Sequence, residues 1–227
     1  MRFPLPLTGA KGRYEVPFGW VDRDRNAGEE VPALRWAHVS GRLAGGGRCG
    51  YTVLNDCKYG HSLDGSTLRV SLLRSSWDPD PLPEMGDHAM RLAVVPHVGA
   101  PTEAELIRLG AAFNHPLTVV ATDVHEGDLP AAGPAAAEAA PAGVLLVAMK
   151  KAEDDDAVIF RLLEASGRAA EAKVSLDPRL LGEPAEVVEV DLLERPIAAG
   201  TARATSGGFA VKLPACGIAS VKVAFRR

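Results

Sequence analysis

The 227-residue sequence has few cysteines, few aromatic residues and no long hydrophobic run. Its three cysteines are scattered and form no C-x-x-C pair, which argues against a disulfide framework or a cysteine-rich zinc site and favours a reducing compartment. The longest strongly apolar run, Val144–Met149, is far shorter than the roughly 20 residues of a membrane helix. Two prolines also interrupt the N-terminus where a signal peptide has its apolar core. We therefore expect a cytoplasmic protein with no membrane partner.

Motifs for several other functions are missing as well. The chain has 25 basic and 29 acidic residues, a net charge of −4 and no basic cluster, so nucleic acid is not an expected partner. No H-x-x-x-H or H-E-x-x-H pair, G-x-S-x-G elbow or glycine-rich phosphate loop is present. The acidic run Asp154–Asp156 lacks the alternating spacing of a calcium loop. We expect no metal or other cofactor to be bound by this chain alone.

The first half of the chain is punctuated by glycine and proline into strand-sized segments. Tyr51–Leu54 is a short apolar run, and the segment from Leu68 alternates apolar and polar residues, which is typical of a half-buried strand. Asp64 and Gly65, just before that strand, indicate a hairpin turn. Met90–Val95 is interpreted as a further strand that ends at Pro96. This part of the chain is predicted to be rich in β-structure.

One segment has helical spacing instead. Thr102 and Glu105 form a capping box, in which each side chain satisfies a free backbone N–H of the first helical turn. Asn114, which precedes a proline by two residues, ends the pattern. We expect a helix of about three turns that lies against a sheet, with its apolar stripe made by Leu106, Leu109 and Phe113.

The second half is predicted to form a separate β-rich block. Residues 128–143 have no large apolar residue after Leu129, so we expect a mobile loop or linker there. Beyond it, Val144–Met149 and Ala157–Leu163 flank an acidic turn like the two arms of a hairpin. Further strands are predicted at Glu186–Leu193, Phe209–Leu213 and Ile218–Phe225, the last with Val221, Val223 and Phe225 facing inward.

The first candidate site is the polar stretch that follows Tyr51–Leu54. An apolar strand that runs into acidic, basic, phenolic and imidazole groups is typical of sites at a sheet edge. The alternative is that the first two residues cap a turn while the lysine and tyrosine pack at the surface. The candidate residues of this stretch are Asn55, Asp56, Lys58, Tyr59 and His61.

The second candidate site is a proline-rich loop. Prolines at positions 79, 81 and 83 fix φ and prevent a helix, so the loop is expected to be stiff and extended. Trp77 would stack on a sugar ring while the neighbouring carboxylates accept hydrogen bonds from hydroxyl groups. The loop would serve equally well as a clamp on a neighbouring domain. Its candidate residues are Arg74, Asp78, Asp80 and His88.

In order, these stretches resemble the C-terminal region of glycoside hydrolase family 38 α-mannosidases. The order and the spacing of the motifs both match, and the resemblance covers nearly the whole chain. The residues that carry it are Tyr14–Gly19, Val31–Trp36, Leu54–Gly60, Leu68–Ser75, Pro79–Pro81, Gly86, His88, Pro96-His97, Phe160–Ala165 and Val190–Arg195.

The resemblance implies an all-β fold with one short helix. Residues 1–127 would form part of a large, mutarotase-like antiparallel supersandwich, 128–142 a linker, and 143–227 a small terminal β-sandwich. In that family the zinc ligands and the carboxylate nucleophile lie in an upstream catalytic domain. No counterpart of them is found in this sequence, so zinc is expected there and this chain alone is not expected to be a complete catalyst.

Three functions follow from these observations. The first is a non-catalytic scaffold that supports an upstream catalytic domain and forms one wall of a cleft for a mannose-containing glycan. The alternative is a stand-alone carbohydrate-binding module, although three Trp and three Tyr offer few residues for an aromatic platform. A self-sufficient metal-dependent hydrolase is the least favoured. If the chain stands alone, its uncovered sheet surfaces predict a homo-oligomer or an exposed apolar patch.

Overall fold

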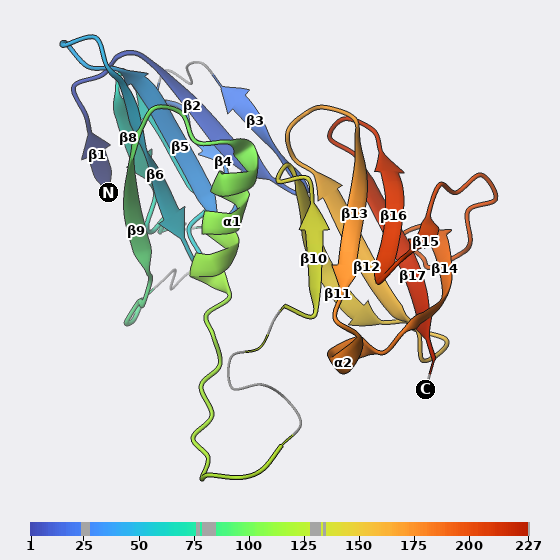
Figure 1. Ribbon diagram of the computed structural model, residues 1–227. Coiled ribbons are helices and arrows are strands. Elements are labelled where there is room, and N and C mark those ends of the chain that lie inside the picture. Colours follow the sequence, from blue (N-terminus) through green and yellow to red (C-terminus); the bar gives the residue numbers. More distant parts are fainter. Residues whose placement is uncertain (24–27, 76–77, 79–84, 128–132, 134, 227) are drawn as a thin grey trace. The chain divides into compact units, whose positions relative to one another are not determined.

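The computed structural model of the chain describes residues 1–23, 28–75, 78, 85–127, 133 and 135–226. The chain divides into two compact units, Met1–Thr118 and Val119–Arg227. Nearly all regular elements are antiparallel strands, which confirms the predicted all-β fold class (Figure 1). The domain limits at 127/128 and 142/143 remain predictions.

The first unit contains two antiparallel sheets. The four-stranded sheet has the order β1-β8-β7-β4, and the five-stranded sheet has the order β3-β2-β5-β6-β9. The predicted hairpin at Asp64 and Gly65 is confirmed, because it joins β7 to β8. The strands are β1 (Arg2–Pro4), β2 (Thr8–Val16), β3 (Gly19–Arg23), β4 (Val31–Pro32), β5 (Trp36–Arg42), β6 (Arg48–Asn55), β7 (Gly60–Asp64), β8 (Thr67–Val70) and β9 (Leu92–Val98).

An apolar core lies between these two sheets. Alternate residues of β2, β5 and β6, among them Tyr14, Val39 and Val53, pack against Leu68 of the other sheet. Successive side chains of a strand point to opposite faces, so the residues between them face outward. The hydroxyl of Tyr51 fastens the sheets together, because it donates to the carbonyl of Phe3 at 2.5 Å and accepts from the N–H of Leu68 at 3.2 Å.

The single long helix, α1 (Glu103–Asn114), covers the outward face of the five-stranded sheet. Its capping box between Thr102 and Glu105 is formed, as the sequence predicted. Gly110 permits the close approach of helix and sheet, because a Cβ atom there would lie 2.7 Å from Cδ1 of Trp36. Leu106 is buried in the same contact.

Strand β9 differs from the prediction. It was expected to end at Pro96, but it runs through this proline to Val98. The N–H of Gly99 bonds to the carbonyl of Arg48, so by the alternation of an antiparallel ladder the nitrogen of Pro96 points away from β6. Because β9 is an edge strand, the missing N–H of Pro96 breaks no bond of the ladder.

The second unit contains two four-stranded sheets, with the orders β10-β13-β16-β15 and β11-β12-β17-β14. One short helix, α2 (Pro178–Leu181), follows β13. The predicted hairpin around the acidic turn and the last two predicted strands are confirmed. The strands are β10 (Ala137–Ala140), β11 (Val144–Lys151), β12 (Val158–Glu164), β13 (Ala170–Leu176), β14 (Pro184–Val190), β15 (Arg203–Thr205), β16 (Gly208–Leu213) and β17 (Ile218–Phe225).

This unit has its own core. Phe160 of β12 and Phe209 of β16 lie with ring centroids 5.4 Å apart, and Val221 and Val223 of β17 pack in the same cluster. Phe225 is packed against it too, so the predicted inward alternation of β17 is confirmed. Burial of the large side chains between the sheets accounts for the sandwich, since each fully buried residue of this size contributes about 1.5–3 kcal/mol.

Two predictions for this half of the chain were wrong in part. The stretch 128–143 was expected to be a loop, but Ala137–Ala140 forms the edge strand β10 and pairs with β13. Small alanine side chains alternate inward there, and Glu138 faces solvent, so no large apolar residue is needed. Residues 128–132 and 134 lie outside the described residues. The strand predicted at Glu186–Leu193 spans Pro184–Val190 and stops before a turn.

Candidate functional site

Asn55, the last residue of β6, connects three segments. It is buried, its amide nitrogen donates to the carbonyl of Leu34 at 2.7 Å, and its amide oxygen accepts from the N–H of Lys58 at 2.8 Å. Its own carbonyl accepts from the side chain of Asn114 at the end of α1, at 3.0 Å. These bonds occupy the side chain of Asn55 within the protein and cap the turn after β6.

Asp56 connects the same turn to the start of β9. Its carboxylate accepts hydrogen bonds from the backbone N–H and from Nε of Arg91, both at 3.0 Å. The N–H of Arg91 and the thiol of Cys57 hold the pKa of Asp56 at about 2, well below its ordinary value. The guanidinium of Arg91 also lies 5.4 Å from the ring centroid of Phe113 in α1. The acid is thus ionised and engaged over the whole neutral range.

The other three predicted residues of this stretch differ in exposure. Lys58 is half-buried, while the side chain of Tyr59 is 52% exposed. His61 is completely buried between the sheets, where burial lowers its pKa. Its Nδ1 lies 3.2 Å from the carbonyl of Tyr59, and its Nε2 has no hydrogen-bond partner among the described residues. His61 is therefore a core residue that does not face a surface cleft.

The proline-rich loop contributes exposed groups. Arg74, Asp78 and His88 are all exposed. Asp80 and Trp77 lie outside the described residues, and the stacking of Trp77 stays a prediction. The structure thus joins Asn55 and Asp56 to α1 and β9, whereas the described loop residues remain at the surface.

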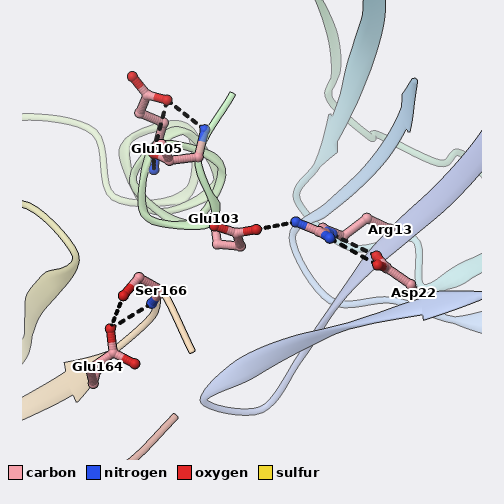
Figure 2. Close-up of polar contacts among 7 residues, drawn as sticks. Arg13, Asp22, Glu103, Glu105, Glu164 and Ser166 are labelled. Atoms are coloured by element: carbon pink, nitrogen blue, oxygen red, sulfur yellow. Dashed lines mark hydrogen bonds and ion pairs between the residues drawn. The ribbon is translucent and has the colours of Figure 1, made fainter. Parts of the chain in front are cut away.

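A polar layer between α1 and the five-stranded sheet was not predicted. Arg13 of β2 bonds with two nitrogens to the carboxylate of Asp22 in β3 and forms an ion pair with Glu103 in the first turn of α1 (Figure 2). Its guanidinium also lies 3.9 Å from the ring centroid of Trp20. The hydrogen bond and charge of Asp22, together with Glu103, raise the pKa of Arg13 despite burial. The layer therefore fixes the first turn of the helix to the sheet.

Two histidines share one hydroxyl in this layer. Oγ1 of Thr52 lies 2.9 Å from Nδ1 of His38 and 2.9 Å from Nε2 of His97, so it is within hydrogen-bond distance of both rings, and the tautomer of each ring decides which group donates. His38 is buried, and burial, followed by the charges of His97 and Arg13, lowers its pKa to about 4. Burial also lowers the pKa of His97. Both rings are therefore neutral at pH 7.

A buried carboxylate organises two loops of the second unit. Glu164, at the end of β12, accepts from the N–H of Ser166 at 2.8 Å and from the hydroxyl of Ser166 (Figure 2). It also accepts from the N–H groups of Arg168 and Cys216, both at 3.0 Å. Burial opposes its ionisation, but these hydrogen bonds outweigh that effect and lower its pKa. The group is an internal anchor.

The described residues contain neither a candidate metal site nor a membrane-spanning helix. Nowhere in the described ranges do three or more histidine, cysteine, aspartate or glutamate side chains gather in a way that could hold a metal ion. Among those same residues, neither helix is long and apolar enough to cross a bilayer. The expectation that zinc belongs to an upstream domain stays a prediction.

Comparison with known proteins identifies two matching families. The family described as "Glycosyl hydrolases family 38 C-terminal domain" matches residues 1–82, and "Glycosyl hydrolases family 38 C-terminal beta sandwich domain" matches residues 143–221. The human protein Alpha-mannosidase 2C1 is 32% identical over 216 residues, which is 88% of this chain and 19% of the human protein. Alpha-mannosidase of Saccharomyces cerevisiae is 33% identical over 117 residues, covering 51% of this chain and 11% of the yeast protein. The chain spans about a fifth or less of these relatives.

Solved structures agree on the fold. A glycosyl hydrolase family 38 protein from Enterococcus faecalis superimposes with a TM-score of 0.74 at 16% identity, over 99% of this chain and 26% of that one. At this identity the match speaks for the fold alone. Both matching families are C-terminal domains, and they follow one another along the sequence. The chain therefore belongs to glycosyl hydrolase family 38, of which it represents the C-terminal region.

Proposed function

We propose that the chain is the non-catalytic C-terminal β portion of an α-mannosidase-like glycoside hydrolase, in which it supports an upstream catalytic domain. The observation that carries this proposal is the match to two C-terminal families in a chain that spans only 19% of its human relative, itself named an α-mannosidase. In this proposal the upstream domain holds zinc and the two carboxyl groups that a retaining glycosidase needs.

The contacts of Asn55 and Asp56 support a bracing role for the first candidate site. Their polar atoms are directed at Leu34, Lys58 and Arg91 of the same unit. A residue that binds a sugar would instead present hydrogen-bonding groups to solvent. The exposed Tyr59, Arg74, Asp78 and His88 are the described candidates for one wall of the glycan cleft.

A cytoplasmic location is also part of the proposal. It is supported by three free cysteines, Cys49, Cys57 and Cys216, which suit a reducing compartment.

The experiment compares the chain alone with the same chain joined to the polypeptide encoded upstream of it. We expect hydrolysis of an aryl α-mannoside only by the longer protein, and its loss after treatment with a zinc chelator. Chelator-sensitive hydrolysis by the purified 227-residue chain would overturn the scaffold assignment. A folded chain, judged by circular dichroism, is the required control for the inactive result.

A carbohydrate-binding module is the second candidate. The half-exposed ring of Tyr59 favours it, because aromatic rings stack on sugars. Titration of the chain with mannose oligosaccharides, followed by intrinsic fluorescence, separates the two functions. Saturable quenching that Tyr59→Ala abolishes would favour the module, whereas an unchanged signal favours the scaffold.

A further inference from the structure

The turn that follows β14 exposes two adjacent leucines. Leu192 and Leu193 are 61% and 71% exposed, and Ile197, just beyond the turn, is 42% exposed. All three lie in the connection between β14 and β15 (Figure 1). One exposed aliphatic side chain is ordinary on a protein surface, but a group of them in one short stretch is typical of an interaction surface.

The backbone of this turn is held by the carboxylate of Asp191. The carboxylate accepts from the N–H of Leu193 at 2.8 Å, and from the N–H and Nε of Arg195, both at 2.9 Å. The N–H of Asp191 in turn donates to the carbonyl of Arg195 at 2.9 Å. The turn is therefore closed by hydrogen bonds at both ends, and the backbone of the two leucines is fixed between them.

Glu194 ties the same turn to the neighbouring hairpin. Its carboxylate accepts from Nζ of Lys150 in β11 at 2.7 Å and from the N–H of Glu153 at 2.9 Å, and its side chain is only 10% exposed. Its φ of 65° lies in the left-handed region, which is uncommon for glutamate. A residue keeps such a conformation only where the surrounding structure holds it. The hydrogen bonds of Glu194 thus hold the turn in one shape.

Polar and apolar side chains have exchanged their usual places in this turn. Charged side chains on a protein surface normally face water. Here the carboxylates of Asp191 and Glu194 bond to groups of the same unit, while the aliphatic side chains of the leucines are exposed. Because the turn is already fixed, little conformational entropy is lost when its leucines are covered. The turn is suited to insertion into an apolar recess of a partner.

The lengths of the relatives indicate which partner offers that recess. The chain spans 19% of the human and 11% of the yeast α-mannosidase, so most of such a protein lies outside these residues. We propose that Leu192 and Leu193 dock into an apolar recess of the polypeptide encoded upstream of the chain. The inference rests on the proposed function, because it names a surface through which the scaffold holds the catalytic domain.

Maleimide labelling of Leu193→Cys tests whether the turn is covered. The variant is prepared in the 227-residue chain and in the longer protein that includes the upstream polypeptide, and labelling at position 193 is followed by mass spectrometry of peptides. We expect rapid labelling in the chain alone and its loss in the longer protein. Leu180→Cys is the matched control, because Leu180 is an exposed leucine (41%) on α2 of the same unit and should be labelled in both proteins.

Melting temperatures measure what the contact contributes. Replacing Leu192 and Leu193 together by serine should leave the melting temperature of the chain alone unchanged, because both side chains are exposed there. The same double variant should lower the melting temperature of the longer protein. Leu180→Ser, as the control, should not lower it. An unchanged melting temperature of the longer protein in the double variant would contradict the proposal.

The labelling results separate the other occupants. Rapid labelling of Leu193→Cys in both proteins would overturn the proposal. Slow labelling already in the chain alone would also overturn it, because the first unit or a second copy would then cover the turn. The proposed function is decided separately, by hydrolysis of an aryl α-mannoside. An active longer protein that is rapidly labelled at position 193 would refute this docking surface and leave the scaffold assignment standing. Circular dichroism confirms that each variant is folded.

Discussion

The side chain of Asn114 donates a hydrogen bond to the carbonyl of Asn55 at 3.0 Å, which ties the last residue of α1 to the last residue of β6. The same asparagine side chain also donates to the carbonyl of Gly110. The side-chain oxygen of Asn55 accepts from the N–H of Lys58 and so caps the turn that contains Asp56. The turn after β6 and the end of the helix are therefore one hydrogen-bonded unit.

Replacing Asn55 by alanine should lower the free energy of unfolding by about 2–4 kcal/mol, because the carbonyl of Leu34 and the N–H of Lys58 lose their partner in a buried place. Urea unfolding measures the change. Lys58→Ala is the matched control, since it keeps the N–H that Asn55 binds. Equal losses in the two variants would contradict the importance of the Asn55 side chain.

Replacing Asp56 by alanine should destabilise the fold by about 1 kcal/mol through the loss of its bonds to Arg91. In the full-length enzyme it should lower the melting temperature while leaving turnover nearly unchanged. Asp154→Ala, at an exposed position of the second unit, should leave the melting temperature as it is. A large loss of turnover at unchanged melting temperature would refute the bracing role.

The stability of the first unit should fall as the pH is lowered from about 6.5 towards 4. The pKa of His38 is lowered to about 4 in the fold, so between these values the unfolded chain binds the extra proton. The contribution of neutral His38 to the free energy of unfolding is fully present above pH 6.5. It amounts to about 3 kcal/mol for the whole difference in pKa between the unfolded and the folded state. In His38→Gln the melting temperature should depend less on pH over this range than it does in the unmodified protein. His125→Gln, in the exposed segment after α1, should keep the unmodified profile.

Gly110→Ala should destabilise the protein although alanine favours helices. The gain in helix propensity is about 1 kcal/mol. The new Cβ would meet the ring of Trp36 at 2.7 Å and Cβ of Arg35 at 3.2 Å, and overpacking costs about 1–3 kcal/mol. Gly127→Ala, where a Cβ meets nothing within 4 Å, is the control. A higher urea midpoint for Gly110→Ala would show that helix and sheet separate easily.

Glu164→Gln should destabilise the second unit by about 2–3 kcal/mol, because an amide has one acceptor oxygen for the three N–H groups that the carboxylate holds. Ser166→Ala removes only the hydroxyl bond and should cost less. Glu138→Gln, at an exposed position of β10, should change little. Since hydrogen bonds lower the pKa of Glu164, its contribution should also fade as the pH drops through that pKa.

Elements with a strong local signal could be predicted from the sequence. The helix follows from its capping box, and β17 follows from its alternating valines. β2 was not predicted, although its charged residues Lys11, Arg13 and Glu15 alternate with uncharged ones as in a half-buried strand. These charges are explained only by partners elsewhere in the chain, such as Glu103, which lies 90 residues from Arg13.

For the candidate site, the sequence indicated some of the residues but not their partners. Asn55 and Asp56 stood out because polar residues directly follow an apolar strand. Their partners, Asn114 and Arg91, could not be inferred, since strand order decides which distant segments meet. His61 was predicted as a candidate site residue, and its position in the short strand β7 places it between the two sheets.

Each core is assembled within its own unit. The cluster around Tyr14 and Leu68 draws only on residues before position 73, and the cluster around Phe160 and Phe209 only on residues after 136. Among the described residues, each of these two clusters is made within one unit. Proteolytic cleavage within the exposed stretch after α1 should consequently leave both units folded.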